Sequence, residues 1–182
     1  MIHYNELQDG KRYVADQELW LNKVAAHCQY ALTLQTPIRT CTLTDANRQF
    51  RRQEITDSLR SFIQRFNREV TGNGWRRKDK FKPVFISAIE GIRPSADKNL
   101  TGHVHAALGN LPSGISKAEL EKTIEVLWSN TRIGKADICI ELLNSGTETR
   151  WTGYMAKESH VGNWECVSYE TAQLPNFVLR TL

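Results

Sequence analysis

The sequence lacks the features that would indicate secretion, a membrane span or a zinc ribbon. Its four cysteines are widely spaced and form no Cys-x-x-Cys pair; they are Cys28, Cys41, Cys139 and Cys166. No apolar run approaches the roughly 20 residues that span a bilayer, and the first residues lack the basic segment and apolar core of a signal peptide. We therefore expect a soluble, cytoplasmic or otherwise intracellular protein with reduced thiols and no membrane partner.

The composition excludes a disordered chain and shows where positive charge is concentrated. Of the 182 residues, 40% are hydrophobic and 24% are charged, as in folded proteins, and this length favours a single domain over residues 1–182. The net charge is +4, but the segment from Arg48 to Lys82 has eleven Lys and Arg against four Asp and Glu, a local balance of +7. This segment indicates either a polyanion-binding surface or a solvated helix face followed by a basic loop.

Hydrophobic periodicity predicts the order of helices and strands. We expect Pro37 to end the first strand, Thr71–Gly74 to end the second helix, and the capping box Ser116–Glu119 to begin the third. The expected elements, in chain order, are helix 16–27, strand 30–36, a further short strand 38–44, a loop over 45–52, helix 54–70, a basic link 75–82, strand 83–90, a polar connection 91–101, strand 102–109, a helix up to 128, strand 136–143 and a short helix 151–158.

After the first helix this order is βαββαβ, which is typical of the ferredoxin-like arrangement. We therefore expect an α+β fold with an antiparallel sheet of about five strands, helices packed on one face, and a C-terminal helix. The core would cover about residues 28–160, with helix 16–27 and the tail 161–182 as extensions. Fold alone indicates no chemistry.

The pattern His103-Val104-His105 carries the first chemical signal. In a strand, residues two apart point to the same side, so both imidazoles would face one way. Two imidazoles can bind a divalent ion if a third ligand comes from a neighbouring strand, and Glu90 ends the preceding expected strand. The alternatives are exposed or hydrogen-bonded histidines, and a strand-end carboxylate in solvent.

A second pair, Tyr154 and Lys157, lies on the last expected helix at a spacing that puts both side chains on one face. A phenol that attacks phosphorus must lose its proton, and its unperturbed pKa is about 10. A nearby cation would stabilise the phenolate or the charge that develops on the phosphate. The alternative is a packed helical tyrosine beside a surface lysine.

Together these segments resemble the HUH endonuclease superfamily, specifically the single-tyrosine rolling-circle replication initiators (Rep proteins). The family's first motif, a strand rich in Thr and apolar residues, is matched by 30–36, with 40–44 as a second choice. Its His-hydrophobic-His motif is matched by 102–107, and its Tyr-x-x-Lys motif by 153–157. The resemblance covers about residues 28–160, and the family's ferredoxin-like fold agrees with the expected order of elements.

The resemblance implies a chemistry for these residues. His103 and His105, with Glu90, would bind Mg²⁺ or Mn²⁺ beside the scissile phosphate. Tyr154, as the catalytic nucleophile assisted by Lys157, would become joined to the 5′ end and release a 3′-OH that can prime synthesis or rejoin strands. Tyr169 is too distant in sequence to form a two-tyrosine site.

The resemblance also implies partners. Single-stranded or hairpin origin DNA would be the substrate, held through its phosphates by the basic link. The side chains expected to bind DNA are Trp75, Arg76, Arg77, Lys78, Lys80 and Lys82. Trp75 could stack on a base or pack as a helix-end core residue. The sequence has no Gly-x-x-x-x-Gly-Lys-Ser/Thr loop, so we expect a partner helicase as well as a polymerase.

Two alternatives remain open at this point. A transposase-like or relaxase-like nickase would use the same chemistry on another DNA, although relaxases usually hold three histidines and the other histidines here are remote in sequence. A non-catalytic nucleic-acid-binding module would expose aromatic residues on its central strands. Phe81 and Phe85 flank one strand, but the next strand offers histidines instead, which favours the enzyme.

Overall fold

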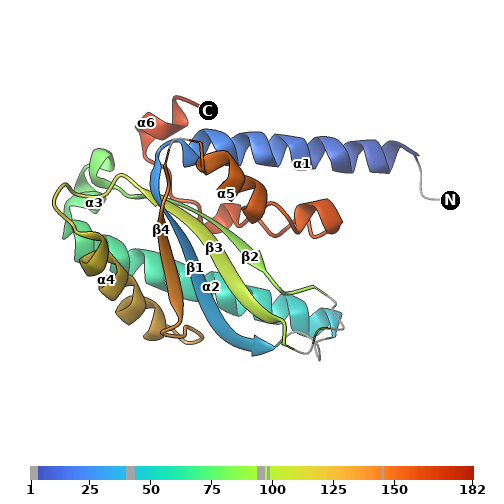
Figure 1. Ribbon diagram of the computed structural model, residues 1–182, viewed down its shortest axis with the longest axis horizontal. Helices are drawn as coiled ribbons and strands as arrows, with labels where there is room; N and C mark the ends of the chain where they lie inside the picture. Colours follow the sequence, from blue (N-terminus) through green and yellow to red (C-terminus); the bar gives the residue numbers. More distant parts are fainter. Residues whose placement is uncertain (1–3, 40–43, 94–96, 98, 145) are drawn as a thin grey trace.

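The computed structural model describes residues 4–39, 44–93, 97, 99–144 and 146–182. The order of the main helices and strands follows the predicted one (Figure 1). The elements are α1 (Tyr4–Ala25), β1 (Cys28–Arg39), α2 (Asp45–Thr71), α3 (Gly74–Arg77), the 3-10 turn η1 (Asp79–Phe81), β2 (Val84–Glu90), β3 (Thr101–Gly109), α4 (Lys117–Ser129), β4 (Ile138–Leu142), α5 (Glu148–Met155), the 3-10 turns η2 (Ser159–Val161) and η3 (Tyr169–Thr171), and α6 (Asn176–Leu179).

The strands form one antiparallel sheet in the order β2-β3-β1-β4. The α+β class is therefore confirmed, but the described residues contain four strands rather than about five. The expected extra strand over 38–44 does not form as a separate element. Ile38 and Arg39 continue β1 and Thr44 caps α2, while 40–43 lie outside the described residues.

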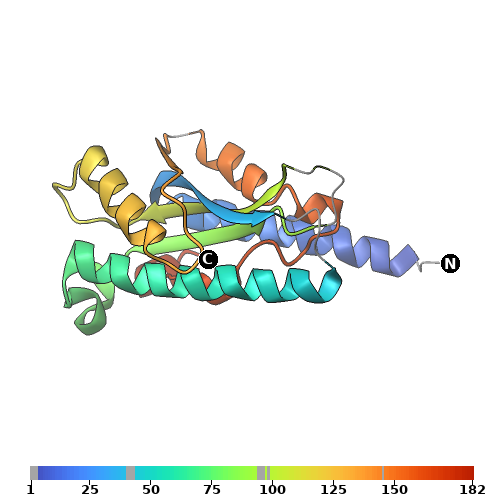
Figure 2. The same cartoon turned by 90° about the horizontal axis from the view of Figure 1, so that it is seen from below.

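Helices cover both faces of the sheet, so the prediction of helices on one face is wrong. Figure 2 shows the sheet between α2 and α5. One core joins α2 and α4 to the sheet, and a second joins α1, α5 and the C-terminal segment to the opposite face. The cause lies in β2, in which all seven residues are buried. The side chains of β2 that point to one face of the sheet and those that point to the other are both largely apolar. Each face must therefore be packed against a layer of other residues to exclude water.

Three helix boundaries differ from the sequence prediction. The expected loop over 45–52 is the first part of α2, because the hydroxyl of Thr44 accepts a hydrogen bond from Asn47 N and caps the helix there. The α1 helix begins before residue 16, so Asp16 is an internal residue and not a cap. The α5 helix runs from Glu148 to Met155, not from 151 to 158.

Pro37 does not end β1, as predicted, but lies within it. The pairing of β1 with β3 is irregular between Gln35 and Arg39, and its pairing with β4 stops at Leu34. The missing N–H of a proline costs no ladder hydrogen bond at such an irregularity. By contrast, the predicted C-terminal end of α2 and the capping box of α4 are confirmed.

The segment after α5, expected as an extension, lies along the outer edge of β2. Val167 bridges Ala88 and Gln173 bridges Phe85, so this edge is partly paired rather than open. Among the described helices, none has both the length and the apolar character needed to cross a membrane.

Candidate metal centre

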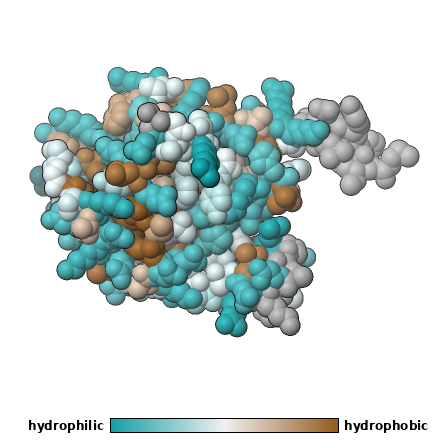
Figure 3. All heavy atoms as spheres, in the orientation of Figure 1, coloured by the Kyte–Doolittle hydropathy of each residue, from teal (hydrophilic) through white to brown (hydrophobic). Residues whose placement is uncertain are grey.

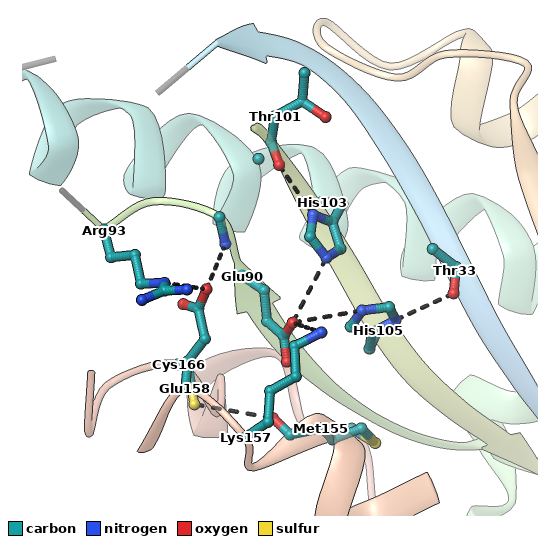
Figure 4. A network of polar contacts seen from close by, with 12 residues as sticks. Thr33, Glu90, Arg93, Thr101, His103, His105, Met155, Lys157, Glu158 and Cys166 are labelled. Atoms are coloured by element: carbon teal, nitrogen blue, oxygen red, sulfur yellow. Dashed lines mark hydrogen bonds and ion pairs between the residues drawn. The ribbon is translucent and has the colours of Figure 1, made fainter. Parts of the chain in front are cut away.

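The two histidines of β3 lie beside Glu90, as the sequence predicted. In the antiparallel register Glu90 is directly opposite His103, and Ala88 is opposite His105. Since alternate residues of a strand share a face, the carboxylate and both imidazoles point to the same side of the sheet. Figure 4 shows the three side chains converging there.

The three side chains meet at one carboxylate oxygen. Oε2 of Glu90 lies 3.5 Å from Nε2 of His103 and 3.5 Å from Nε2 of His105. One nitrogen or oxygen of each residue lies within 4.8 Å of the others, a grouping that could hold a metal ion. Glu90 is completely buried and His105 nearly so, so these positions are fixed by packing.

Hydrogen bonds behind the imidazoles orient their Nε2 atoms toward Glu90. Nδ1 of His103 lies 2.9 Å from the carbonyl oxygen of Thr101. A carbonyl only accepts, so Nδ1 must donate, which leaves the lone pair of the neutral ring on Nε2. Nδ1 of His105 lies 3.1 Å from Oγ1 of Thr33 on β1. Such outer partners fix the ring orientation of metal-binding histidines.

The chemistry of this group fits a cation. Oε1 of Glu90 and Nε2 of His105 are buried and form no hydrogen bond to any described residue, whereas Oε2 of Glu90 is paired with the ammonium of Lys157. Buried polar atoms without partners are rare and costly. A divalent ion would satisfy carboxylate and imidazole lone pairs together, so Glu90, His103 and His105 are suitable ligands.

Lys157 contacts the same carboxylate. Its Nζ lies 2.7 Å from Oε2 of Glu90 and 3.7 Å from the ring centre of Tyr154. The lysine therefore links the strand that bears the carboxylate to the expected nucleophile. The sequence suggested only that Lys157 shares a helix face with Tyr154, and the contact with Glu90 is additional.

The charges of the group are strongly coupled. Burial raises the pKa of the Glu90 carboxyl, but contacts with the neighbouring imidazoles and ammonium outweigh burial and bring it to about 2. Burial lowers the pKa of His103, yet its bonds to Glu90 and Thr101 leave it above its ordinary value. For His105 burial prevails, and the pKa lies below its ordinary value. Glu90 is therefore ionised at neutral pH.

The pKa of Lys157 is also displaced. Burial lowers it, but the contacts of the ammonium with Glu90 and Tyr154 outweigh burial, and the net shift is upward. The lysine is thus a permanent cation at neutral pH, placed to act on a phenolate or a phosphate.

Tyr154 stands at the open side of this group. It is 46% exposed, and its ring centre lies 4.7 Å from that of His105 in an edge arrangement. Trp151 stacks on it at 5.6 Å and donates from Nε1 to the carbonyl of Ala106 on β3 at 3.2 Å. Sequence reasoning missed Trp151, although its position three residues before Tyr154 on the same helix was a usable signal.

A cavity of about 550 Å³ opens beside Tyr154 and Lys157. Its wall on α5 includes Arg150 and Trp151, and its floor includes Ala31 of β1 and Glu141 of β4. Both α5 and β4 lie on the face seen in Figure 1, which is mainly hydrophilic with apolar atoms gathered left of centre (Figure 3). This cavity could not be predicted from sequence, because its walls come from three separate elements.

The structure does not bring the basic link to this centre. Arg76 and Arg77 are exposed on α3, Lys80 on η1 and Lys78 between these two elements. Both elements precede the first residue of β2, whereas Glu90 is its last. Seven strand residues span about 20 Å at roughly 3.3 Å each. These cations therefore lie well away from the candidate metal ligands.

Two of the residues expected to bind DNA have contacts of their own. Lys82 pairs with Asp79 at 2.9 Å. Trp75 is half-buried, and the guanidinium of Arg76 lies over its ring at 5.2 Å. This placement favours packing of Trp75 over stacking on a base.

No protein-family model, curated protein or solved structure matches this chain.

Proposed function

We propose that this protein is a divalent-metal-dependent endonuclease that nicks single-stranded DNA and joins Tyr154 to the 5′ end. The observation that carries the proposal is the packing of an exposed tyrosine against His105, with Lys157 between that tyrosine and Glu90. A nucleophile, a fixed cation and a candidate metal-binding group thus lie side by side. Such a combination can activate a phenol and a phosphodiester for transesterification.

The fold supports an assignment to the HUH endonuclease superfamily. The β2-β3-β1-β4 antiparallel order, with α2 following β1 and α4 following β3, is the order of a ferredoxin-like sheet. The strand 30–36, which resembles the family's first motif, contains Thr33, and Thr33 contacts His105. All three motif segments therefore meet at one centre.

Mg²⁺ or Mn²⁺ is the cofactor we propose for Glu90, His103 and His105. When bound, such an ion polarises a non-bridging phosphate oxygen and neutralises developing charge. Two imidazoles and one carboxylate suit Mn²⁺ and other divalent ions and leave coordination positions for substrate oxygens.

The chain's own residues would carry out the exchange. The Tyr154 oxygen attacks phosphorus and loses its proton, the bond from phosphorus to the 3′ oxygen breaks, and that oxygen takes up a proton to become a 3′-OH. Lys157 stabilises the phenolate oxygen and the added negative charge on the phosphate. Attack by a 3′-OH on the phosphotyrosine reverses the reaction and joins strands without an external energy source.

We propose origin DNA, single-stranded or in a hairpin, as the substrate, and initiation of rolling-circle replication of a plasmid, phage or mobile element as the outcome. A transposase-like or relaxase-like role would use the same centre on other DNA. Unwinding and synthesis would be supplied by a partner helicase and polymerase.

The proposal is tested by incubating the protein with Mn²⁺ and a pool of single-stranded oligonucleotides of random sequence, followed by denaturing electrophoresis. A covalent protein–DNA adduct should form, disappear in Tyr154→Phe and persist in Tyr169→Phe. Tyr169 is a matched control because it is equally exposed, at 45% against 46%. DNA binding without any adduct would favour a non-catalytic nucleic-acid-binding module.

A further inference from the structure

Glu158 is a buried carboxylate that the proposed reaction does not use directly. It is 4% exposed, yet both of its oxygens have partners. Oε1 accepts a hydrogen bond from the backbone N–H of Gly91 at 3.0 Å and lies 3.3 Å from Nε of Arg93. Oε2 accepts from the side-chain amide of Asn163 at 2.7 Å. Figure 4 shows the carboxylate between the end of β2 and the chain that follows α5.

Gly91 is the residue directly after Glu90, and it makes a turn that requires glycine. Its φ is +75°, and a Cβ there would lie 2.3 Å from the carbonyl oxygen of Thr101. Its N–H is directed to Glu158. The peptide that fixes the end of β2, and with it the Glu90 side chain, is thus held from the side of α5.

On its other side Glu158 directly follows Lys157, at the end of the segment that bears Tyr154. The beginning of this segment is anchored elsewhere, by Trp151 on the carbonyl of Ala106 and by Thr152 on Asn22 of α1. At the far end Glu158 is an anchor to β2, and the hydroxyl of the adjacent Ser159 donates to the side chain of Gln17 on α1. The hydrogen bond between Glu158 and Gly91 therefore joins the residue that follows Lys157 to the residue that follows Glu90.

We propose that Glu158 is a positioning residue that sets the separation between the nucleophile segment and the strand that carries Glu90. This role rests on the proposed function. Displacement of a reacting group by about 1 Å can cost about 100-fold in rate, and the nucleophile and the carboxylate come from elements that are remote in sequence. Loss of Glu158 should therefore slow chemistry more than it weakens DNA binding.

The experiment compares Glu158→Ala and Glu158→Gln in the full chain, with Glu54→Ala as the control. Glu54 is also a buried carboxylate, 6% exposed and paired with Arg51 and Arg132, but it contacts no residue of the candidate centre. For each variant we would measure thermal unfolding, the affinity for Mn²⁺ alone by calorimetry, DNA affinity, and the single-turnover rate of adduct formation at saturating DNA.

We expect Glu158→Ala to lower the single-turnover rate about 10- to 100-fold and to weaken Mn²⁺ binding, with DNA affinity within about twofold of wild type. Glu158→Gln should recover most of both losses, because its amide oxygen can still accept from Gly91 N. Glu54→Ala should unfold at lower temperature, but its folded fraction should bind Mn²⁺ and react as wild type does.

Glu158→Ala with normal Mn²⁺ affinity and a normal rate per folded molecule would reduce Glu158 to a structural residue and overturn the proposal. If the wild-type protein binds Mn²⁺ but forms no adduct, the nuclease assignment fails, and an unchanged Mn²⁺ affinity in Glu158→Ala would still overturn the positioning of Glu90. If the wild-type protein neither binds Mn²⁺ nor forms an adduct, both the proposed function and the positioning role of Glu158 are wrong.

Discussion

Nζ of Lys157 lies 2.7 Å from Oε2 of Glu90. The same oxygen is 3.5 Å from Nε2 of both His103 and His105. The lysine ammonium would therefore share the Glu90 carboxylate with a metal ion held by this group, and two cations at one carboxylate repel each other. We therefore expect Lys157 to affect metal affinity as well as the proposed reaction.

We predict that Lys157→Met binds Mn²⁺ about tenfold more tightly than wild type, because the competing charge is gone, while adduct formation slows about 100-fold because the phenolate and phosphate lose their cation. Calorimetry with Mn²⁺ alone and single-turnover assays would measure the two effects separately. Lys157→Arg, which keeps the charge, is the control. Weaker Mn²⁺ binding in Lys157→Met would mean that the lysine organises Glu90 rather than competing for it.

His103→Ala and His105→Ala should each abolish nicking and Mn²⁺ binding but leave DNA affinity largely intact, because each removes a proposed metal ligand and no side chain proposed to bind DNA. Electrophoresis of adducts and fluorescence anisotropy of labelled DNA would report the two properties. His160→Ala is the matched control, since His160 is half-exposed and pairs with Glu18 on α1. A parallel collapse of binding and nicking would make the two histidines structural.

Mn²⁺ affinity should depend on pH in a direction that the pKa values of the two imidazoles set. The pKa of His103 is above its ordinary value and that of His105 is below it. A metal must displace the proton from Nε2 of His103, so affinity should fall as the pH drops below the raised pKa of His103, by up to about tenfold per unit. Calorimetry between pH 8 and about pH 5.5 would show it. An affinity that stays flat over this range would exclude a histidine ligand of raised pKa.

The proximity of Glu90 to the two histidines could be predicted from the sequence, because it depends only on the alternation of side chains along two strands and on the short connection between those strands. Both features can be read from a local stretch of sequence. The roles of Thr33 and Glu158 were not predicted, because each contacts the centre or its supports across tens of residues of sequence, where periodicity gives no information. The second helical layer was missed for a related reason. A strand with apolar residues on both faces shows that each face is covered, but not by which segment.

Thr33→Val should weaken Mn²⁺ binding about tenfold or more, because the outer hydrogen bond to Nδ1 of His105 is lost and the ring can turn away from Glu90. Valine has nearly the same shape as threonine, so the packing of β1 should change little. Calorimetry provides the measurement, and Thr33→Ser, which keeps the hydroxyl, should restore most of the affinity. Equal loss in both variants would attribute the effect to packing and not to the hydrogen bond.

Combined replacement of Arg76, Arg77 and Lys78 by Gln should weaken DNA binding and flatten its dependence on salt, by about 0.7 in the logarithmic slope for each lost contact with a single strand and about 0.9 with a duplex. The single-turnover rate at saturating DNA should stay unchanged, because these side chains lie at the opposite end of β2 from Glu90. Replacement of three exposed lysines on other surfaces, Lys11, Lys117 and Lys122, controls for total charge. If the salt slope changes as much in the control variant as in the basic-link variant, DNA affinity depends on net charge alone, and the basic link is not part of the DNA interface.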